Sequence, residues 1–282
     1  MALASNPGIV LVTGTSSGIG LHAAIAAARA GHTVVATMRN LEGARALRDA
    51  AAVAEVSLDI RRLDVTEPRA AADAVAQTID RHGRLDAVIN NAGSGRLGTI
   101  ENETVDDIRA VMEVNFFGVV ALTRAALPYL RGSRGRLITV SSVGGVIGQP
   151  FNEAYCAAKF AVEGFMESLA PVAATAGVTG TVVEPGAVAS SFVANVGGDL
   201  SRTGPANDPY AGALDAYLAR TASAFGSAQS AKSAGETVAA LLDGDRPPFR
   251  VQTSETARQF VAVKLADLDG GAVQRMTGAW LG

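Results

Sequence analysis

The chain is short of several residue types, and each shortage excludes a class of protein. One cysteine, Cys156, among 282 residues excludes a disulfide framework and a multi-cysteine zinc site. A net charge of −3 and a pI of about 5.7 argue against general nucleic-acid binding, which needs a basic face. No uninterrupted apolar run approaches the roughly 18–20 residues of a membrane span, and the first ten residues lack the basic and apolar regions of a secretion signal. We expect a soluble cytoplasmic protein without a membrane span.

Lysine is the scarcest of the charged residues. The chain has 24 basic residues, but lysine occurs only at Lys159, Lys232 and Lys264, and arginine supplies the rest. The first 158 residues contain no lysine at all. A lysine at position 159 therefore needs an explanation beyond its positive charge.

Hydrophobic residues make up 48% of the chain, enough for a core, and they fall in a regular order. Apolar runs that predict buried strands are Ile9–Thr13, Thr33–Met38, part of Val56–Leu63, Leu85–Asn90, Arg136–Ser141, Thr179–Glu184 and Phe249–Val251. Helices are predicted between them at Gly18–Ala30, Leu41–Ala52, Glu67–His82 with Pro68 in its first turn, Thr104–Arg131 as two helices meeting near Val114–Gly118, Asn152–Ala176 and Ser233–Leu242. Strands that are apolar throughout and separated by helices predict a single α/β domain, with a doubly wound parallel sheet and helices on both faces.

A glycine-rich turn joins the first predicted strand to the first helix. Its spacing is G-x-x-x-G-x-G, not the G-x-G-x-x-G of most dinucleotide folds. Glycines let the backbone approach a pyrophosphate, and the helix N-terminus offers free N–H groups and a positive dipole end. We expect this turn to bind a dinucleotide, although Gly/Ser turns between a strand and a helix are common. The residues placed at the cofactor are Gly14, Ser16, Ser17, Gly18, Ile19 and Gly20.

The end of the second strand bears on which dinucleotide binds. NAD sites usually carry an acidic residue about 20 residues after the turn, whereas here Arg39 stands in that place. A guanidinium can pair a 2′-phosphate bidentately, which favours NADP(H) over NAD(H). The alternative is a solvated surface arginine. Farther along, Asp64-Val65 could hold the adenine amino group, or Asp64 could be a helix N-cap.

Tyrosine and lysine stand one helical turn apart at Tyr155 and Lys159. A tyrosine that acts as an acid or base needs its pKa lowered from about 10, and an ammonium about 4 Å away at an effective dielectric near 20 contributes about 4 kcal/mol, or three pKa units. Ser141 and Ser142, after the fifth strand, could hold a substrate oxygen beside the tyrosine. The alternative is an incidental pair on an amphipathic helix.

Taken together, these motifs resemble the classical short-chain dehydrogenases/reductases. The matching pieces, in the order and at the spacing of that family, are Thr13-Gly14-x-x-x-Gly18-x-Gly20, Asn90-Asn91-Ala92-Gly93, Asn115, Ser142, Tyr155-x-x-x-Lys159 and Pro185-Gly186. The resemblance covers roughly residues 8–192. It implies a Rossmann fold with a cofactor-binding and catalytic core over residues 8–186, and C-terminal helices and a last strand over 231–282. The glycine-punctuated, polar stretch 187–230 between them is expected to be a substrate lid.

The resemblance also implies roles for single residues. Tyr155 would exchange a proton with the substrate oxygen, and Ser142 would orient that oxygen. Lys159 would bond the nicotinamide ribose hydroxyls and lower the tyrosine pKa, while Asn115 would hold a water in a proton relay. A bifurcated contact to two ribose hydroxyls suits a compact ammonium better than a planar guanidinium, which gives a reason for lysine here. Further cofactor contacts are implied at Asn91, Ala92, Gly93, Pro185, Gly186, Val188 and Ser190.

Two segments, residues 34–39 and 148–156, resemble the subgroup that contains 17β-hydroxysteroid dehydrogenase type 1 and related retinol dehydrogenases. In that subgroup the residues at the positions of Arg39 and Ser17 contact the 2′-phosphate, which supports NADP(H). Apolar side chains in the expected pocket wall indicate an apolar, polycyclic or long-chain substrate. Arg96, in the same wall, could meet a carboxylate or could be solvated. The expected substrate contacts are Ser142, Val143, Gln149, Phe151 and Phe192.

The sequence therefore predicts an NADP(H)-dependent oxidoreductase that interconverts a ketone or aldehyde and an alcohol on a steroid- or retinoid-like substrate. One alternative is a 3-oxoacyl-thioester reductase acting on an acyl carrier protein, which would need a basic docking patch. Another is a non-catalytic NADP(H) sensor that binds a protein partner. The resemblance also implies a homodimer or homotetramer that assembles through the long helices at 104–131 and 152–176.

Overall fold

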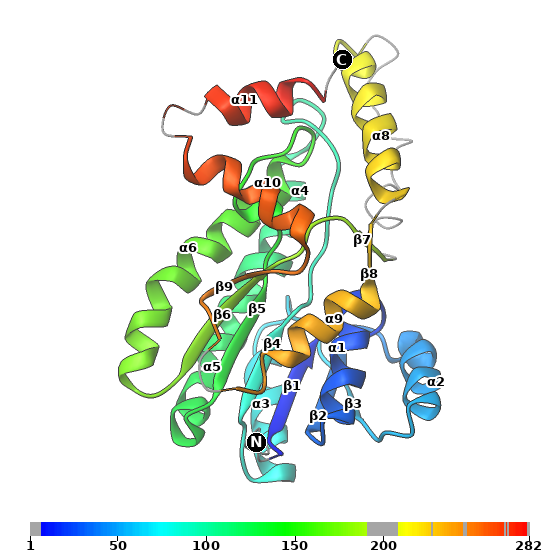
Figure 1. Cartoon of the computed structure of the whole chain (residues 1–282). Helices are drawn as coiled ribbons and strands as arrows, with labels where there is room; N and C mark the ends of the chain where they lie inside the picture. The colour runs from blue at the N-terminus through cyan, green and yellow to red at the C-terminus, as the bar shows by residue number, and fades with distance from the viewer. Residues whose placement is uncertain are drawn as a thin grey trace.

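A seven-stranded parallel sheet forms the centre of the computed structural model (Figure 1). The structure describes residues 7–190, 208–226, 228–244, 247–267, 269 and 271–280. The strands are β1 (Ile9–Thr13), β2 (Thr33–Met38), β3 (Asp59–Arg62), β4 (Ala87–Asn90), β5 (Arg136–Val140), β6 (Thr179–Glu184) and β9 (Arg250–Gln252). Their order is β3-β2-β1-β4-β5-β6-β9, and each neighbouring pair is parallel. The strand order reverses between β1 and β4, which opens a crevice at the carboxyl ends of these two strands. The predicted doubly wound sheet is confirmed.

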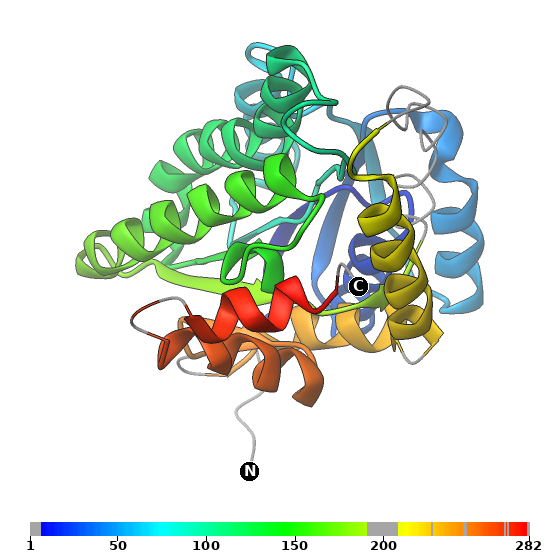
Figure 2. The same ribbon diagram turned by 90° about the horizontal axis from the view of Figure 1, so that it is seen from above.

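Helices cover both faces of the sheet (Figure 2). The helices of the described residues are α1 (Gly18–Arg29), α2 (Arg45–Val53), α3 (Ala70–His82), α4 (Val105–Met112), α5 (Gly118–Ser133), α6 (Glu153–Thr175), α8 (Ala211–Gly226), α9 (Ala231–Ala240), α10 (Glu255–Leu265) and α11 (Gly271–Gly278). Val10 and Val12 of β1 pack with α1, α2 and α9, whereas Leu11 packs with α3, α5 and α6. Both faces of the strand are therefore buried, which explains why its sequence is apolar throughout.

The two predicted helices that meet near Val114–Gly118 are joined by a π-helical turn, Glu113–Phe117. The continuous helix Val105–Ser133 contains an 18-residue window with a mean hydropathy of 1.5, so by length and composition alone it could cross a membrane. Charged residues such as Arg109, Glu113 and Arg124 interrupt this helix, so it is not an uninterrupted apolar run. Leu122, Ala126 and Leu130 on this helix are buried against the sheet.

Two helix starts differ from the prediction. The helix predicted from Glu67 begins at Ala70, because Arg69 takes a left-handed conformation with φ of 70° and leaves Pro68 before the helix. The helix predicted from Leu41 opens with a 3₁₀ turn, Leu41–Ala44, in which the Asn40 side chain accepts a hydrogen bond from the Glu42 N–H. Other boundaries move by one or two residues.

The predicted lid contains regular structure in its described part. A short strand β7 (Val188–Ala189) pairs with β8 (Gln229–Ser230), and α8 stands between them in the chain. In Figure 1, α8, α10 and α11 lie beyond the carboxyl ends of the strands. Phe151, Tyr217 of α8 and Trp280 after α11 form one buried cluster. The C-terminal helices therefore join α8 in covering this end of the sheet, which the sequence reasoning did not foresee.

We expect Gly235→Ala to destabilise the protein by about 1–3 kcal/mol, since overpacking a close contact has costs of that size. A Cβ at Gly235 of α9 would lie 2.6 Å from His22 Cβ and 2.7 Å from Ala23 N of α1. Gly132→Ala in α5 is the control: nothing lies within 4 Å of its added Cβ, so we expect no loss, or a gain of up to about 1 kcal/mol. Urea denaturation measures both. Equal stability of the two variants would contradict the close packing of α9 on α1.

Candidate active site

The glycine turn after β1 has a shape that only glycine permits. Gly14 and Gly18 have φ values of 69° and 60°, in the left-handed region. A Cβ on Gly20 would lie 2.3 Å from Asn91 Nδ2 and 2.4 Å from the Gly14 carbonyl oxygen. A Cβ on Gly14 would lie 2.8 Å from Ala92 Cα. The turn is thus a backbone surface at the start of α1, which fits the expected pyrophosphate cradle.

The turn after β4 is hydrogen-bonded to the glycine turn. Asn91 Nδ2 donates to the carbonyls of Thr13 and Gly14, at 2.9 and 3.0 Å. The backbone N–H groups of Asn91 and Ala92 both donate to Thr13 Oγ1, at 2.9 Å each. The Asn91 side chain therefore supports the shape of the cradle.

Four predicted catalytic residues lie together at the carboxyl ends of β4 and β5. Ser142 and Tyr155 share a side-chain hydrogen bond, and Ser142 Oγ also accepts from the Gly144 N–H at 3.0 Å. Lys159 Nζ is 5.8 Å from the centre of the Tyr155 ring. A Cβ on Gly93 would lie 3.0 Å from Asn115 Oδ1 and 3.7 Å from Lys159 Nζ. Gly93 is therefore the point at which Asn115 and Lys159 come near each other.

Burial governs the ionisation of this group. It raises the pKa of Tyr155 to about 12, against the opposing effect of the Ser142 hydrogen bond. It also lowers the pKa of Lys159 to about 8, although the Glu163 charge favours the ammonium. In the chain without a bound cofactor, burial is the largest influence on the Tyr155 pKa, and the lowering of that pKa by Lys159 stays a prediction. Lys159 Nζ donates to the Val140 carbonyl at 3.0 Å, and the loss of hydration at Tyr155 dominates. Tyr155 therefore carries its proton at neutral pH.

Asn115 lies fully buried in the π-helical turn, with its side chain occupied. Its Nδ2 donates to the carbonyls of Ser94 and Val111, at 2.8 and 2.9 Å, and its Oδ1 accepts from the Ser94 N–H at 3.3 Å. The side chain thus fixes the Ser94 loop beside Gly93. A π-helical turn at a functional position is a common arrangement.

The expected 2′-phosphate region is polar and exposed. Arg39 follows β2, and Ser17 is the exposed N-cap residue of α1. A Cβ on Gly43 would lie 3.8 Å from Ser16 Cβ, so the loop after Arg39 borders the glycine turn. Asp64 is not the N-cap of α3, which begins at Ala70; its Oδ1 accepts from the Thr66 N–H and hydroxyl, at 3.0 and 2.8 Å. Although burial acts in the opposite direction, these bonds and the Arg39 charge hold the pKa of Asp64 below its usual value.

Apolar side chains of the expected substrate wall pack against α8 and the C-terminal helices, which together cover this end of the sheet. Val143 packs against Ala257 and Val261 of α10. Phe151, with a left-handed φ of 60°, packs 5.6 Å from the Tyr217 ring centre. The Gln149 N–H donates to Cys156 Sγ at 3.4 Å, in keeping with a packed cysteine.

The remaining predicted contacts lie at or beyond the edge of the described chain. Val188 is buried against α9, and a Cβ on Gly18 would lie 3.4 Å from Ser190 Cβ. Phe192, predicted to contact the substrate, lies outside the described residues. Sequence reasoning missed Tyr217, Phe260 and Trp280, although aromatic side chains are only 5% of the chain and Trp280 is its single tryptophan.

Arg96 forms ion pairs with two carboxylates. Its Nε lies 2.8 Å from Glu103 Oε1, and its Nη2 lies 3.1 Å from Asp107 Oδ2. The Glu103 side chain is only 3% exposed, and burial raises the pKa of Glu103 while the Arg96 charge opposes that rise. Arg96 therefore compensates an internal carboxylate, a role that the sequence reasoning did not foresee, while its side chain stays 25% exposed.

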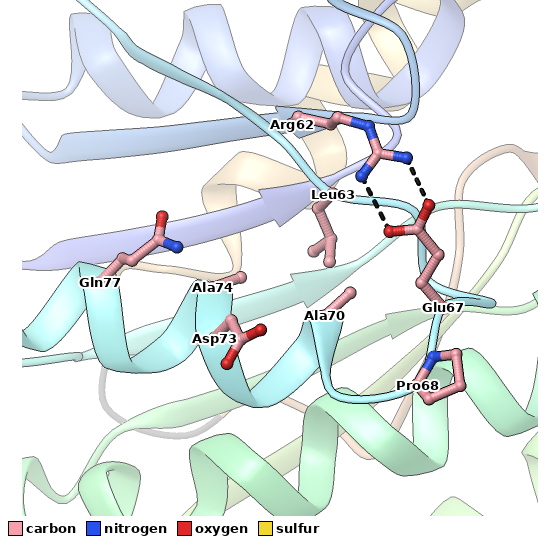
Figure 3. A pocket seen from close by; sticks show the side chains of 8 residues that line it. All are labelled: Arg62, Leu63, Glu67, Pro68, Ala70, Asp73, Ala74 and Gln77. Carbon is pink, nitrogen blue, oxygen red and sulfur yellow. Dashed lines mark hydrogen bonds and ion pairs between the residues drawn. The ribbon is translucent and has the colours of Figure 1, made fainter.

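A separate pocket lies between the end of β3 and the start of α3 (Figure 3). Arg62 and Glu67 form a two-pronged ion pair across it, with Arg62 Nη1 donating to Glu67 Oε2 at 2.8 Å. Its lining residues are Arg62, Leu63, Glu67, Pro68, Ala70, Asp73, Ala74 and Gln77. Since none of these is a predicted site residue, the pocket is distinct from the Ser142–Tyr155–Lys159 group.

Known proteins are similar to this chain in both sequence and fold. Residues 8–200 match the short chain dehydrogenase family. The chain belongs to this family. It is 35% identical to retinol dehydrogenase 8 of Bos taurus over 284 residues, which cover 97% of this chain and 90% of the relative. It is 36% identical to 17-beta-hydroxysteroid dehydrogenase type 1 of Homo sapiens over 272 residues, which cover 93% of this chain and 82% of the relative.

Among solved structures, this short-chain dehydrogenase is similar to a single-residue variant of the actinorhodin polyketide ketoreductase with NADPH. The TM-score is 0.74 and the identity 27%, and the match covers 89% of this chain and 97% of the ketoreductase. Membership of the family makes the protein an oxidoreductase that acts on alcohol or carbonyl groups of small molecules. The family and this NADPH-bound neighbour support a nicotinamide cofactor.

We expect Arg96→Met in this short-chain dehydrogenase to lower the free energy of unfolding by about 2–3 kcal/mol, because it leaves the buried Glu103 carboxylate without its cation. Urea denaturation at pH 7 measures this loss. The double variant Arg96→Met/Glu103→Met removes both charges and should recover most of the stability. An Arg96→Met protein of unchanged stability would show that the arginine has no structural role and would reopen its role at a substrate.

Proposed function

We propose that this short-chain dehydrogenase uses NADP(H) to interconvert a ketone or aldehyde and an alcohol on an apolar, steroid- or retinoid-like substrate. The observation that carries the proposal is the group formed by Ser142, Tyr155 and Lys159 at the carboxyl ends of β4 and β5, next to an apolar cover. The names of the two curated relatives, a retinol and a hydroxysteroid dehydrogenase, support the substrate class.

In the proposed reaction, Tyr155 exchanges a proton with the substrate oxygen. Its raised pKa keeps the phenol protonated at neutral pH, so in the chain alone it is ready to donate in the direction of reduction. The Ser142 hydroxyl, already bonded to Tyr155, is placed to orient the same oxygen. In the direction of oxidation Tyr155 accepts the proton from the alcohol. A bound NADP(H) supplies or accepts the hydride.

Lys159 has two proposed roles. Its buried ammonium would bond the nicotinamide ribose hydroxyls, and its charge would favour the tyrosinate once it lies closer to the phenol than in the chain alone. Asn115 fixes the Ser94 loop next to Lys159, and we assign to this region the proton connection from Lys159 to solvent. All four groups are present together, which counts against a non-catalytic sensor, since binding alone does not need them.

Backbone shape and surface charge support NADP(H) as the cofactor. The glycine cradle has no side chain where a pyrophosphate would approach, and Gly93 leaves the space before Lys159 open to a ribose. At the adenosine end, Arg39 is exposed where an NAD site would carry a carboxylate, and Ser17 of the glycine turn is exposed as well. We assign the 2′-phosphate to these two residues.

The cover over the site supports an apolar substrate. Phe151, Tyr217 and Trp280 are buried together, and Phe260 stacks on Trp280 with ring centres 5.8 Å apart. A polar contact within this cover is Asn152 Nδ2 donating to the Tyr217 hydroxyl at 2.7 Å. These side chains make an apolar environment at this end of the sheet, which suits a ring system or a long chain better than a small polar carbonyl.

The second candidate is a 3-oxoacyl-thioester reductase, favoured by the likeness to a polyketide ketoreductase. A turnover screen with NADPH and NADP⁺ against steroids, retinoids, quinones, simple aldehydes and acyl thioesters separates the two. A preference for steroids or retinoids supports the first proposal. A preference for acyl thioesters would replace it.

For the assembly we propose a homodimer or homotetramer in the cytoplasm, formed through α4, α5 and α6. These helices expose large apolar side chains at Val105, Tyr129, Phe160 and Val172, and the π-helical turn between α4 and α5 exposes Phe117. Exposed apolar side chains on long helices are suited to a subunit interface.

Tyr155→Phe should reduce turnover of the preferred substrate by at least a factor of about 100, because it removes only the proton that is exchanged. NADPH oxidation followed by absorbance measures the rate. NADPH affinity, measured by its fluorescence, should stay within about twofold of wild type. Turnover above one tenth of the wild-type rate would show that Tyr155 is not the acid.

Arg39→Asp should lower kcat/KM with NADPH by about 10- to 100-fold, since a hydrogen bond to a charged group contributes about 1.5–3 kcal/mol. The same change should raise the preference for NADH, because a carboxylate suits the ribose 2′-hydroxyl. Arg45→Asp, at a side chain that is 92% exposed on α2, is the control for a change of surface charge. An unchanged ratio of NADPH to NADH activity in Arg39→Asp would refute the 2′-phosphate contact.

A further inference from the structure

A buried charged cluster lies behind Lys159, outside the motifs that define the proposed site. Glu163 follows Lys159 by one turn of α6, Glu184 ends β6, and Arg250 begins β9. Arg250 Nε lies 3.3 Å from Glu163 Oε2 and 3.3 Å from Glu184 Oε1. The two carboxylate side chains are 8% and 0% exposed. The cluster therefore joins the catalytic helix to two strands of the sheet.

Glu163 packs directly against the turn that carries the catalytic serine. A Cβ on Gly145 would lie 2.5 Å from Ser141 Oγ, 3.0 Å from Glu163 Cγ and 3.0 Å from the Lys159 carbonyl oxygen. Gly145 thus leaves no side chain between the Ser141 turn and α6. The carboxylate and the lysine share a helical face and the same buried region.

The cations around this cluster do not match its carboxylates one to one. Two buried carboxylates, Glu163 and Glu184, share the guanidinium of Arg250. Arg250 also donates from Nη2 to Glu167 Oε2 at 2.6 Å, and that carboxylate is 61% exposed. Gln252 Nε2 donates to Glu184 Oε2 at 2.8 Å. Lys159 of α6 is the other cation whose charge acts on this region.

Burial shifts the pKa values of Glu163 and Lys159 toward each other. Burial raises the pKa of Glu163 to about 7, against the Ser141 hydrogen bond and the Arg250 charge, with the Glu184 charge adding to the rise. Burial lowers the pKa of Lys159 to about 8, and the Glu163 charge opposes that fall. Burial thus shifts both groups toward neutral pH, and the charge of Glu163 favours the charged form of Lys159.

We propose that Glu163 is a positioning residue, whose buried carboxylate one helical turn from Lys159 holds that lysine as an ammonium and so extends the activity of the Tyr155–Lys159 pair to higher pH. The claim about activity rests on the proposed function, in which the Lys159 ammonium takes part in the reaction. The claim that Glu163 keeps Lys159 charged is independent of the proposed function. The groups facing Glu163 are Lys159 and, through Arg250, Glu167 on α6, together with Ser141 after β5, Glu184 on β6 and Arg250 on β9.

The scarcity of lysine makes the charge of Lys159 measurable directly. Protein labelled with ¹³C at the lysine ε-carbon has three lysine signals, and the Lys159 signal is the one that Lys159→Arg removes. Titration should give a wild-type midpoint near pH 8 and a smaller inflection near pH 7 from Glu163. Glu163→Gln should remove the inflection and lower the midpoint by roughly one pH unit.

Glu167→Gln is the matched control, because it also removes a carboxylate from Arg250 but at an exposed position. Its Lys159 midpoint should equal that of wild type. An unchanged Lys159 midpoint in Glu163→Gln would overturn the proposal. If that variant does not fold, the absence of the inflection near pH 7 in the wild-type titration would overturn it instead.

Activity provides the second readout. Between pH 6 and 9, kcat of Glu163→Gln should equal that of wild type at the acid end, where Glu163 is already protonated, and fall up to about tenfold below it at the alkaline end. A loss of the same size at every pH would indicate a merely structural role and would overturn the proposal. If the Lys159 midpoint moves as expected but no carbonyl compound is reduced, the proposed function fails and the assignment of charge stands. If turnover is found and the midpoint does not move, the inference alone fails.

Discussion

The rest of the site depends on the hydrogen bonds that join the turn after β1 to the turn after β4. On one side of this point the sheet grows from β1 to β2 and β3, and on the other side it grows from β4 to β5, β6 and β9. A sheet whose strand order reverses in this way has a crevice at the carboxyl ends of the two central strands. Asn91 spans it by donating to two carbonyls of the glycine turn, and Thr13 Oγ1 accepts two backbone N–H groups in return. A Cβ on residue 20 would lie 2.3 Å from Asn91 Nδ2. The hydrogen bonds of the Asn91 amide therefore require glycine at position 20. The cradle on one side and Gly93 on the other are fixed by the same few bonds.

Loss of hydration, more than any pair of charges, sets the chemistry beyond the crevice. It raises the pKa of Tyr155, lowers that of Lys159 and raises that of Glu163, so each group is moved toward its neutral form. Charges then oppose these shifts at particular places: Glu163 for Lys159, and Arg250 for Glu163. Helix α6 carries all three groups, Tyr155, Lys159 and Glu163, at intervals of four residues. A helix buried along one face thus places an acid, a cation and a counter-charge in one line.

Sequence reasoning reached the parts of this arrangement that depend on local pattern. Apolar strands, the join at residues 113–117 and the neighbourhood of Asn115, Ser142, Tyr155 and Lys159 follow from periodicity, turn residues and the family resemblance. The misplaced start of α3 has a local cause, since Arg69 adopts a left-handed backbone that its residue type does not announce. The contacts of Arg96 were missed for another reason. They depend on which groups are buried together, here Glu103 beside Arg96, and distance along the sequence carries little information about burial.

Burial also explains why lysine stands at position 159 in a chain that otherwise uses arginine. A guanidinium stays charged under all ordinary conditions and demands several partners for its planar donors. Lys159 is 4% exposed, and the described contact of its Nζ is the Val140 carbonyl at 3.0 Å. An ammonium can be held there because it is compact and can give up its proton, and its lowered pKa reflects that possibility. The same property makes the lysine sensitive to Glu163: a cation whose pKa lies near the working pH responds to a neighbouring carboxylate, whereas an arginine in its place would not. The choice of lysine and the presence of a buried carboxylate one turn later therefore belong to one electrostatic arrangement.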